Sequence, residues 1–146
     1  MNPLVKAIAI ASNAHLTHEP DKGGAAYILH PLRMMMRMTT DEERMVAVLH
    51  DVVEDHIDDG WTFERLAEEG IPESVITALR CVTKITEDED YTTFIHRAAS
   101  NPLAKAVKLA DLEDNMNVLR IADLSDKDVK RLRKYHTHWK WLMTQP

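Results

Sequence analysis

Histidine and carboxylate side chains stand in an order that could hold a metal ion, most densely in the run His50-Asp51-Val52-Val53-Glu54-Asp55. At about 100° per residue, the four polar side chains of this run fall within one arc of a helix. Crowded carboxylates repel one another, and partial burial makes their ionisation costlier. A divalent cation with nitrogen and oxygen ligands would relieve that repulsion, and His50 and Asp51 offer both kinds of ligand. A solvated acidic stripe at a helix end is the alternative interpretation.

Two residues far from this run could complete a metal site. His30 immediately precedes Pro31, a position biased against helical dihedrals, so we expect its side chain at the entrance of a helix, pointing inward. Asp111 follows Ala106-Val107-Lys108-Leu109-Ala110 and is flanked by small and apolar residues, and an aspartate buried in mid-helix needs a partner. Taken singly, either residue could instead make a purely structural hydrogen bond.

The elements that would position these residues are helices. The chain of 146 residues has only four glycines, too few for the turns of a many-stranded sheet. Prolines that follow Asn2, His30, Ile71 and Asn101 mark helix starts. Further starts are predicted at Thr40 and Ser125, which resemble capping boxes, at Thr62, and in the region 88–91. The sequence therefore predicts an all-α fold, a compact helical bundle with one domain over residues 1–146.

The run that begins at His50 lies in what the sequence predicts as one continuous helix from about Asp41 to His56. Met45, Val46, Leu49, Val52 and Val53 form a broad apolar face opposite the polar arc. That helix should be packed deep in the bundle, with its polar arc facing a cleft. The segment 17–25, which contains Pro20, Gly23 and Gly24, is predicted as a loop that borders His30.

The overall charge limits the partners. With 18 basic and 24 acidic side chains the formal net charge is -6, which argues against broad binding to nucleic acid. No apolar run approaches the roughly 18 residues of a membrane span, and no export signal is recognisable. We expect a cytoplasmic protein that binds neither nucleic acid nor membrane, with its oligomeric state open.

Taken together, these residues resemble the HD superfamily of metal-dependent phosphohydrolases. More narrowly, the chain is similar to the hydrolase domain of RelA/SpoT-type alarmone enzymes and their small stand-alone relatives. The likeness spans nearly the whole chain, from Ala14-His15 to Lys134-Tyr135. It rests on Tyr27 to Pro31, Leu49 to Asp55, Val82 to Lys84, Val107 to Asp111, and Asn115-Met116.

The resemblance implies a site and a reaction. His30, His50, Asp51 and Asp111 would be the metal ligands, with manganese the usual ion, and Glu54 and Asp55 the catalytic acids. Asn115 would contact the substrate or orient Asp111, and Lys22, Lys84 and Lys108 could hold phosphate. The reaction would remove the 3'-pyrophosphate from guanosine tetra- or pentaphosphate, (p)ppGpp, the nucleotide of the stringent response.

Two departures from the family pattern concern the substrate. The family usually carries a basic run between its Ala-His and His-Pro, whereas this chain has only Lys22 there. After Asp111, an arginine, a histidine and a threonine of the family are replaced. A different nucleotide phosphate, or a catalytically weak metal-bearing nucleotide sensor, therefore remains an alternative. The presence of Glu54 and Asp55 favours catalysis. The remaining histidines are expected to be surface or core residues: His15, His18, His56, His96, His136 and His138.

Overall fold

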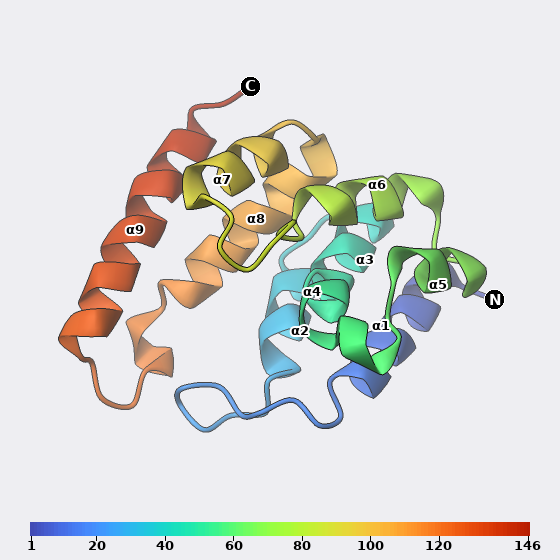
Figure 1. The fold of residues 1–146 in the computed structure, drawn as a ribbon, viewed down its shortest axis with the longest axis horizontal. Helices are drawn as coiled ribbons and strands as arrows, with labels where there is room; N and C mark the ends of the chain where they lie inside the picture. Colours follow the sequence, from blue (N-terminus) through green and yellow to red (C-terminus); the bar gives the residue numbers. More distant parts are fainter.

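Helices make up all the regular structure in the computed structural model, which describes residues 1–146 (Figure 1). The α-helices are α1 (Pro3–Ala14), α2 (Leu29–Met36), α3 (Asp41–Leu49), α4 (Val52–His56), α5 (Phe63–Glu68), α6 (Glu73–Cys81), α7 (Tyr91–Ala99), α8 (Pro102–Asn115) and α9 (Asp126–Met143). Two 3-10 turns, η1 (Ile57–Asp59) and η2 (Val118–Arg120), complete the set. The all-α prediction is confirmed.

Most helix starts lie where the local sequence predicts them. The Asn2 side chain caps α1 and the Asn101 side chain caps α8, each followed by a proline whose missing N–H costs nothing there. Thr40 and Ser125 form complete capping boxes at α3 and α9. These starts are therefore encoded by local hydrogen bonding.

The predicted starts at Pro31 and Pro72 are displaced. Pro72 is the N-cap of α6, so that helix begins one residue later. Helix α2 begins at Leu29, which places His30 inside its first turn; the expectation that His30 would precede the helix is wrong. Pro31 is tolerated there because the N–H groups of a first turn have no acceptor within the helix.

Helix α3 forms the centre of the fold. It packs against α1, α2, α6 and α8, and five consecutive residues, 45–49, are buried. The apolar segment 45–49 covers every side of its part of the helix and therefore needs neighbours on every side, which the main hydrophobic cluster of 25 buried residues supplies. The prediction that this segment is deeply packed is confirmed.

The predicted continuous helix from Asp41 to His56 is interrupted. Helix α3 ends at Leu49 and α4 begins at Val52. The cause is local: the ring Nδ1 of His50 lies 2.8 Å from the carbonyl oxygen of Ala47, the acceptor that a continuing helix would offer to the N–H of Asp51. The break leaves His50 and Asp51 between the two helices.

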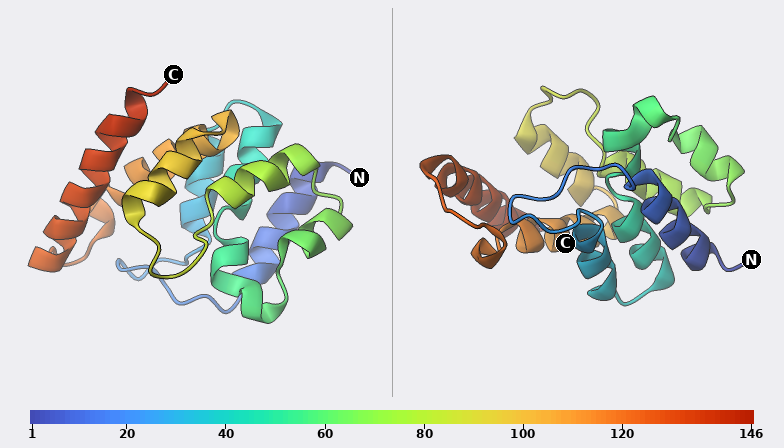
Figure 2. Two further views of the ribbon diagram at one scale, coloured as in Figure 1. Left: turned by 45° about the horizontal axis from the view of Figure 1, so that its top comes forward. Right: turned by 90° about the horizontal axis from the view of Figure 1, so that it is seen from below.

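The last helix, α9, flanks α7 and α8 at the end of the molecule away from α1, as both views in Figure 2 show. A small cluster of Ile95, Leu112 and Leu142 joins these three helices. The loop between α1 and α2 reaches α9 through an ion pair of 2.6 Å between Lys22 and Asp128. None of the helices is both long and apolar enough to cross a lipid bilayer.

Candidate metal centre and pocket

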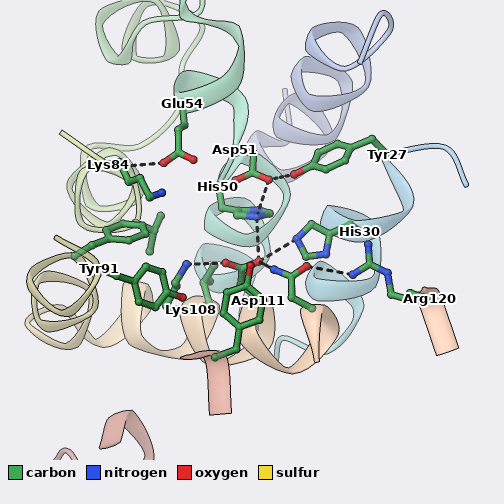
Figure 3. Close-up of a pocket in the computed structure, with 15 residues that line it drawn as sticks. Tyr27, His30, His50, Asp51, Glu54, Lys84, Tyr91, Lys108, Asp111 and Arg120 are labelled. Atoms are coloured by element: carbon green, nitrogen blue, oxygen red, sulfur yellow. Dashed lines mark hydrogen bonds and ion pairs between the residues drawn. The ribbon is translucent and has the colours of Figure 1, made fainter. Parts of the chain in front are cut away.

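The four residues proposed as metal ligands lie together at one end of a pocket of about 190 Å³ (Figure 3). His30 comes from α2, Asp111 from α8, and His50 and Asp51 from the break between α3 and α4. The pocket is lined by Tyr27, His30, His50, Asp51, Glu54, Val82, Lys84, Tyr91, Phe94, Val107, Lys108, Asp111, Asn115, Arg120 and Tyr135. Three segments far apart in sequence therefore meet around one polar point.

The imidazole of His50 presents an unpaired nitrogen to this point. Its Nδ1 donates to the carbonyl of Ala47, which can only accept, so Nε2 carries a lone pair. That Nε2 is buried and has no hydrogen-bond partner, although Asp51 Oδ2 lies 3.1 Å away and Asp111 Oδ1 3.7 Å away. Burial lowers the pKa of His50 to about 4, so the ring is neutral near pH 7. A lone pair thus faces two carboxylates.

The Nδ1 of His30, like that of His50, is held by an oxygen acceptor, here the carboxylate of Asp114. Its Nδ1 lies 2.6 Å from Asp114 Oδ2, and Asp114 also accepts hydrogen bonds from Arg33 and Arg120. Although burial opposes it, the bonds from His30 and Arg33 hold the pKa of Asp114 far below its usual value. The ionised carboxylate fixes the hydrogen on Nδ1, so His30 Nε2 points at Asp111 Oδ1 from 3.0 Å.

Asp111 is the most heavily partnered carboxylate in the pocket. Its Oδ2 accepts from Lys108 Nζ at 2.8 Å, and its Oδ1 accepts from Asn115 Nδ2 at 3.0 Å. Burial alone would raise the pKa of Asp111, but Lys108 and His30 hold it well below the ordinary value. Asp111 is therefore a fixed, ionised oxygen ligand.

The pKa of Asp51 is shifted in the opposite direction from that of Asp111. Burial, followed by the charges of Asp111 and Asp55, raises the pKa of Asp51 well above the ordinary value. Its Oδ2 accepts a hydrogen bond from the Tyr27 hydroxyl. Neighbouring protein charges thus disfavour the ionised form of Asp51, and a cation beside it would favour that form.

The donor set fits a divalent metal ion. His30, His50 and Asp51 each offer one ligand atom, and these atoms lie within 4.8 Å of one another. Asp111 Oδ1 adds a second oxygen close to both imidazole nitrogens. An ion at this point would satisfy the orphaned Nε2 of His50, whose lone pair faces the carboxylate oxygens of Asp51 and Asp111.

The two proposed catalytic acids occupy different positions. Glu54 lines the pocket, and its carboxylate accepts the backbone N–H of Lys84 at 2.9 Å. Burial raises the pKa of Glu54 and also that of Asp55. Asp55 lines the adjoining groove and not the pocket itself. Glu54 and Asp55 are consecutive residues of α4, about 100° apart around its axis, and of the two only Glu54 lines the pocket that holds the metal ligands.

Only two of the three lysines proposed to bind phosphate line the pocket. Lys84 and Lys108 line the pocket, as does Asn115. Lys22 does not, because its ammonium group is paired with Asp128 on α9. Asn115 donates to Asp111, the orienting role that was one of its two expected roles.

Two pocket residues were missed from the sequence. Tyr27 was noted only as part of a motif, yet its hydroxyl contacts Asp51. Arg120, in η2, lines the pocket and donates to Asp114 and Asn115. Arg120 restores a positive charge near the place where the family pattern after Asp111 had lost one. Its position depends on the turn after α8, where the Asn117 side chain accepts the N–H of Leu119; this cap is a local signal for the turn, although it does not show what Arg120 contacts.

Comparison with known proteins establishes the fold. No family model matches this chain, and no curated protein matches it. Among solved structures, the chain is similar to one described as a metazoan ortholog of SpoT that hydrolyzes ppGpp and plays a role in starvation responses. The TM-score is 0.80 at 22% sequence identity, over 99% of this chain and 88% of that chain. The chain therefore shares the fold of that SpoT ortholog, in agreement with the fold that the resemblance in sequence implied.

Proposed function

We propose that this chain is a metal-dependent phosphohydrolase that removes pyrophosphate or phosphate from a nucleotide. The leading candidate substrate is guanosine tetra- or pentaphosphate, from which the 3'-pyrophosphate would be removed. The leading candidate for the metal ion is manganese. The observation that carries the proposal is the buried, unpartnered Nε2 of His50, set among His30, Asp51 and Asp111. A mixed set of imidazole and carboxylate ligands suits Mn²⁺ as well as other divalent ions.

A divalent ion in this site would supply Lewis-acid activation of water and of a phosphoryl oxygen. The protein supplies positioning and charge. Lys84 lines the pocket without an ion-pair partner and can bind a phosphate group, whereas Lys108 and Arg120, which also line it, are paired with Asp111 and Asp114. This supports a phosphorylated substrate in spite of the negative net charge of the chain.

Glu54 is suited to proton transfer. In the hydrolysis, a water oxygen attacks phosphorus, the bond from phosphorus to the 3' oxygen breaks, and the 3' oxygen gains a proton. Glu54 lines the pocket, and burial raises the pKa of its carboxyl group toward neutral pH. A carboxyl group whose pKa lies nearer the working pH can both accept and return a proton. We assign it the transfer of the proton from water to the leaving oxygen.

The neighbouring hollow offers room for the nucleoside. A second pocket of about 310 Å³ shares Tyr27, Asn115, Arg120 and Tyr135 with the first. A substrate with its phosphate groups at the metal ligands could extend its sugar and base into this hollow. The continuity supports a nucleotide over inorganic pyrophosphate.

The test is product release from a panel of nucleotides that includes ppGpp, measured with and without Mn²⁺. We expect Mn²⁺-dependent hydrolysis by the wild type, loss of Mn²⁺ binding and of activity in Asp51→Ala, and loss of activity with Mn²⁺ binding retained in Glu54→Gln. The exposed Asp123→Asn serves as the charge-matched control. Hydrolysis unaffected by Asp51→Ala would overturn the metal mechanism. Metal binding without hydrolysis of any nucleotide would favour a sensor.

A further inference from the structure

Three histidines outside the proposed metal centre also meet at one point. They are His15 at the end of α1, His18 in the following loop, and His56 at the end of α4. The Nε2 of His56 lies 3.0 Å from His15 Nδ1 and 2.9 Å from His18 Nδ1, and these two Nδ1 atoms are 3.1 Å apart. His15 and His56 are buried, and His18 is partly exposed. We call these three residues the histidine cluster.

Hydrogen bonds alone cannot satisfy this triangle of nitrogens. The Nδ1 of His56 lies 3.3 Å from the carboxylate of Asp59, which accepts its hydrogen, so His56 enters the triangle with a lone pair. If both His15 and His18 carry a hydrogen on Nδ1, those hydrogens face each other. If only one of His15 and His18 carries a hydrogen on Nδ1, the lone pair of the other faces the lone pair of His56 Nε2. If neither carries one, all three nitrogens face one another with lone pairs. One of the three contacts is repulsive in every neutral arrangement.

The surroundings keep His15 and His18 neutral. Burial, followed by the neighbouring histidines, lowers the pKa of His15 to about 3, and burial also lowers the pKa of His18. The other ring nitrogen of His15 is buried without a partner, so every polar contact of that ring is made inside the cluster. Neutral imidazoles with converging nitrogens are the form in which histidine binds metals.

We propose that His15, His18 and His56 form a second metal site, which takes a divalent transition-metal ion that prefers imidazole ligands, such as zinc. Metal–nitrogen bonds of about 2.0–2.1 Å in a tetrahedral site place the nitrogens roughly 3.3 Å apart, a few tenths of an ångström beyond the spacing observed here. Asp59 behind His56 is the carboxylate partner that orients many metal-bound histidines. The partly exposed side of His18 leaves access for the ion and for a fourth ligand.

The ligands distinguish the histidine cluster from the first site. The cluster has three nitrogens and no carboxylate, whereas the first site combines two histidines with Asp51 and Asp111. Imidazole-only sites favour zinc, copper or nickel over manganese. The two sites should therefore differ in metal preference.

An ion in the histidine cluster would also fix the wall of the pocket. The ring of His18 stacks on Tyr27, with centroids 3.7 Å apart and planes at 3°, and the hydroxyl of Tyr27 contacts Asp51. The cluster ties the end of α1, the loop after it and the end of α4 together. Its role would be structural: it holds the loop that presents Tyr27.

The test is a metal count on the full chain, stripped with a chelator and then titrated with Zn²⁺ or Co²⁺ alone. We expect the wild type to bind two ions and Asp51→Ala to retain one, with the visible absorption of four-coordinate cobalt. His18→Ala and His56→Ala should each remove that absorption in the Asp51→Ala background, and each should remove one ion from the wild type. His136→Ala, which removes an exposed histidine outside the cluster, should match the wild type. Circular dichroism checks that each variant is folded.

A graded variant separates metal binding from folding. Asp59→Asn should weaken zinc binding about tenfold in the Asp51→Ala background, and the neighbouring, exposed Asp58→Asn should not. No ion bound to folded Asp51→Ala, or equal binding in wild type and folded His18→Ala, would overturn the second site. Neither readout uses hydrolysis, so the proposal stands or fails separately from the proposed activity.

Discussion

The Nδ1 of His30 and the Oδ2 of Asp114 lie 2.6 Å apart, behind the face of His30 that points toward the other ligands. Such an outer carboxylate fixes the tautomer of a metal-binding histidine and raises its basicity. Asp114→Asn keeps the shape and removes the charge. We expect about a tenfold to hundredfold loss of Mn²⁺ affinity, measured by competition with a metal-sensitive dye. Unchanged affinity, equal to that of the exposed control Asp123→Asn, would contradict this role for Asp114.

Lys108 and Asp111 form a buried ion pair that an added cation would partly replace. Lys108→Met leaves Asp111 without its nearest positive charge, which costs about 3–5 kcal/mol in the free energy of unfolding of the metal-free protein. With saturating Mn²⁺ the loss should be smaller, because the ion compensates the same carboxylate. Urea unfolding with chelator and with Mn²⁺ measures both values. Lys108→Gln, which keeps a donor, is the milder variant. Equal losses under both conditions would show that no ion binds beside Asp111.

The sequence predicts the helices well because their starts depend on neighbours along the chain. The side chains of Asn2, Thr40, Asn101 and Ser125 bond to backbone within three residues, so their capping patterns can be recognised without tertiary information. The apolar character of 45–49 likewise identifies the central helix. His30, His50, Asp51 and Asp111 do lie together, as the family resemblance implied.

The remaining features depend on contacts that the sequence pattern does not encode. The helix break follows from a side-chain bond between His50 and the backbone of Ala47, which competes with a regular helix of equally suitable composition. The pairing of Lys22 with Asp128 spans 106 positions, and this contact removes a lysine that composition alone offered to the substrate. The histidine cluster joins residues up to 41 positions apart, so no local spacing marks it.

Asp128 should contribute to the acid sensitivity of the fold. The bonds from Lys22 and Ser125 lower the pKa of Asp128, so its ionised form is favoured in the folded state. Its contribution to stability is therefore present above its unfolded pKa of about 3.9 and is lost as the pH falls below that value. We expect Asp128→Asn to lower Tm at neutral pH, with the difference from wild type shrinking toward about pH 2. Asp126→Asn, in the same turn, is the control. A difference that is independent of pH would contradict this assignment.

We expect substitutions of Lys84 and Lys22 to affect kcat/KM to different extents. Lys84 lines the pocket, so Lys84→Ala removes a charge-assisted bond to phosphate worth about 1.5–3 kcal/mol, a loss of about 10-fold to 150-fold in kcat/KM. Its backbone N–H, which holds Glu54, is unaffected by the substitution. Lys22 lines the neighbouring hollow and is paired with Asp128, so Lys22→Ala should lower kcat/KM less than Lys84→Ala does and should also lower Tm. Steady-state kinetics on the best nucleotide of the panel decides between them. A larger kinetic loss in Lys22→Ala than in Lys84→Ala would place the phosphate groups near α9 instead of in the pocket.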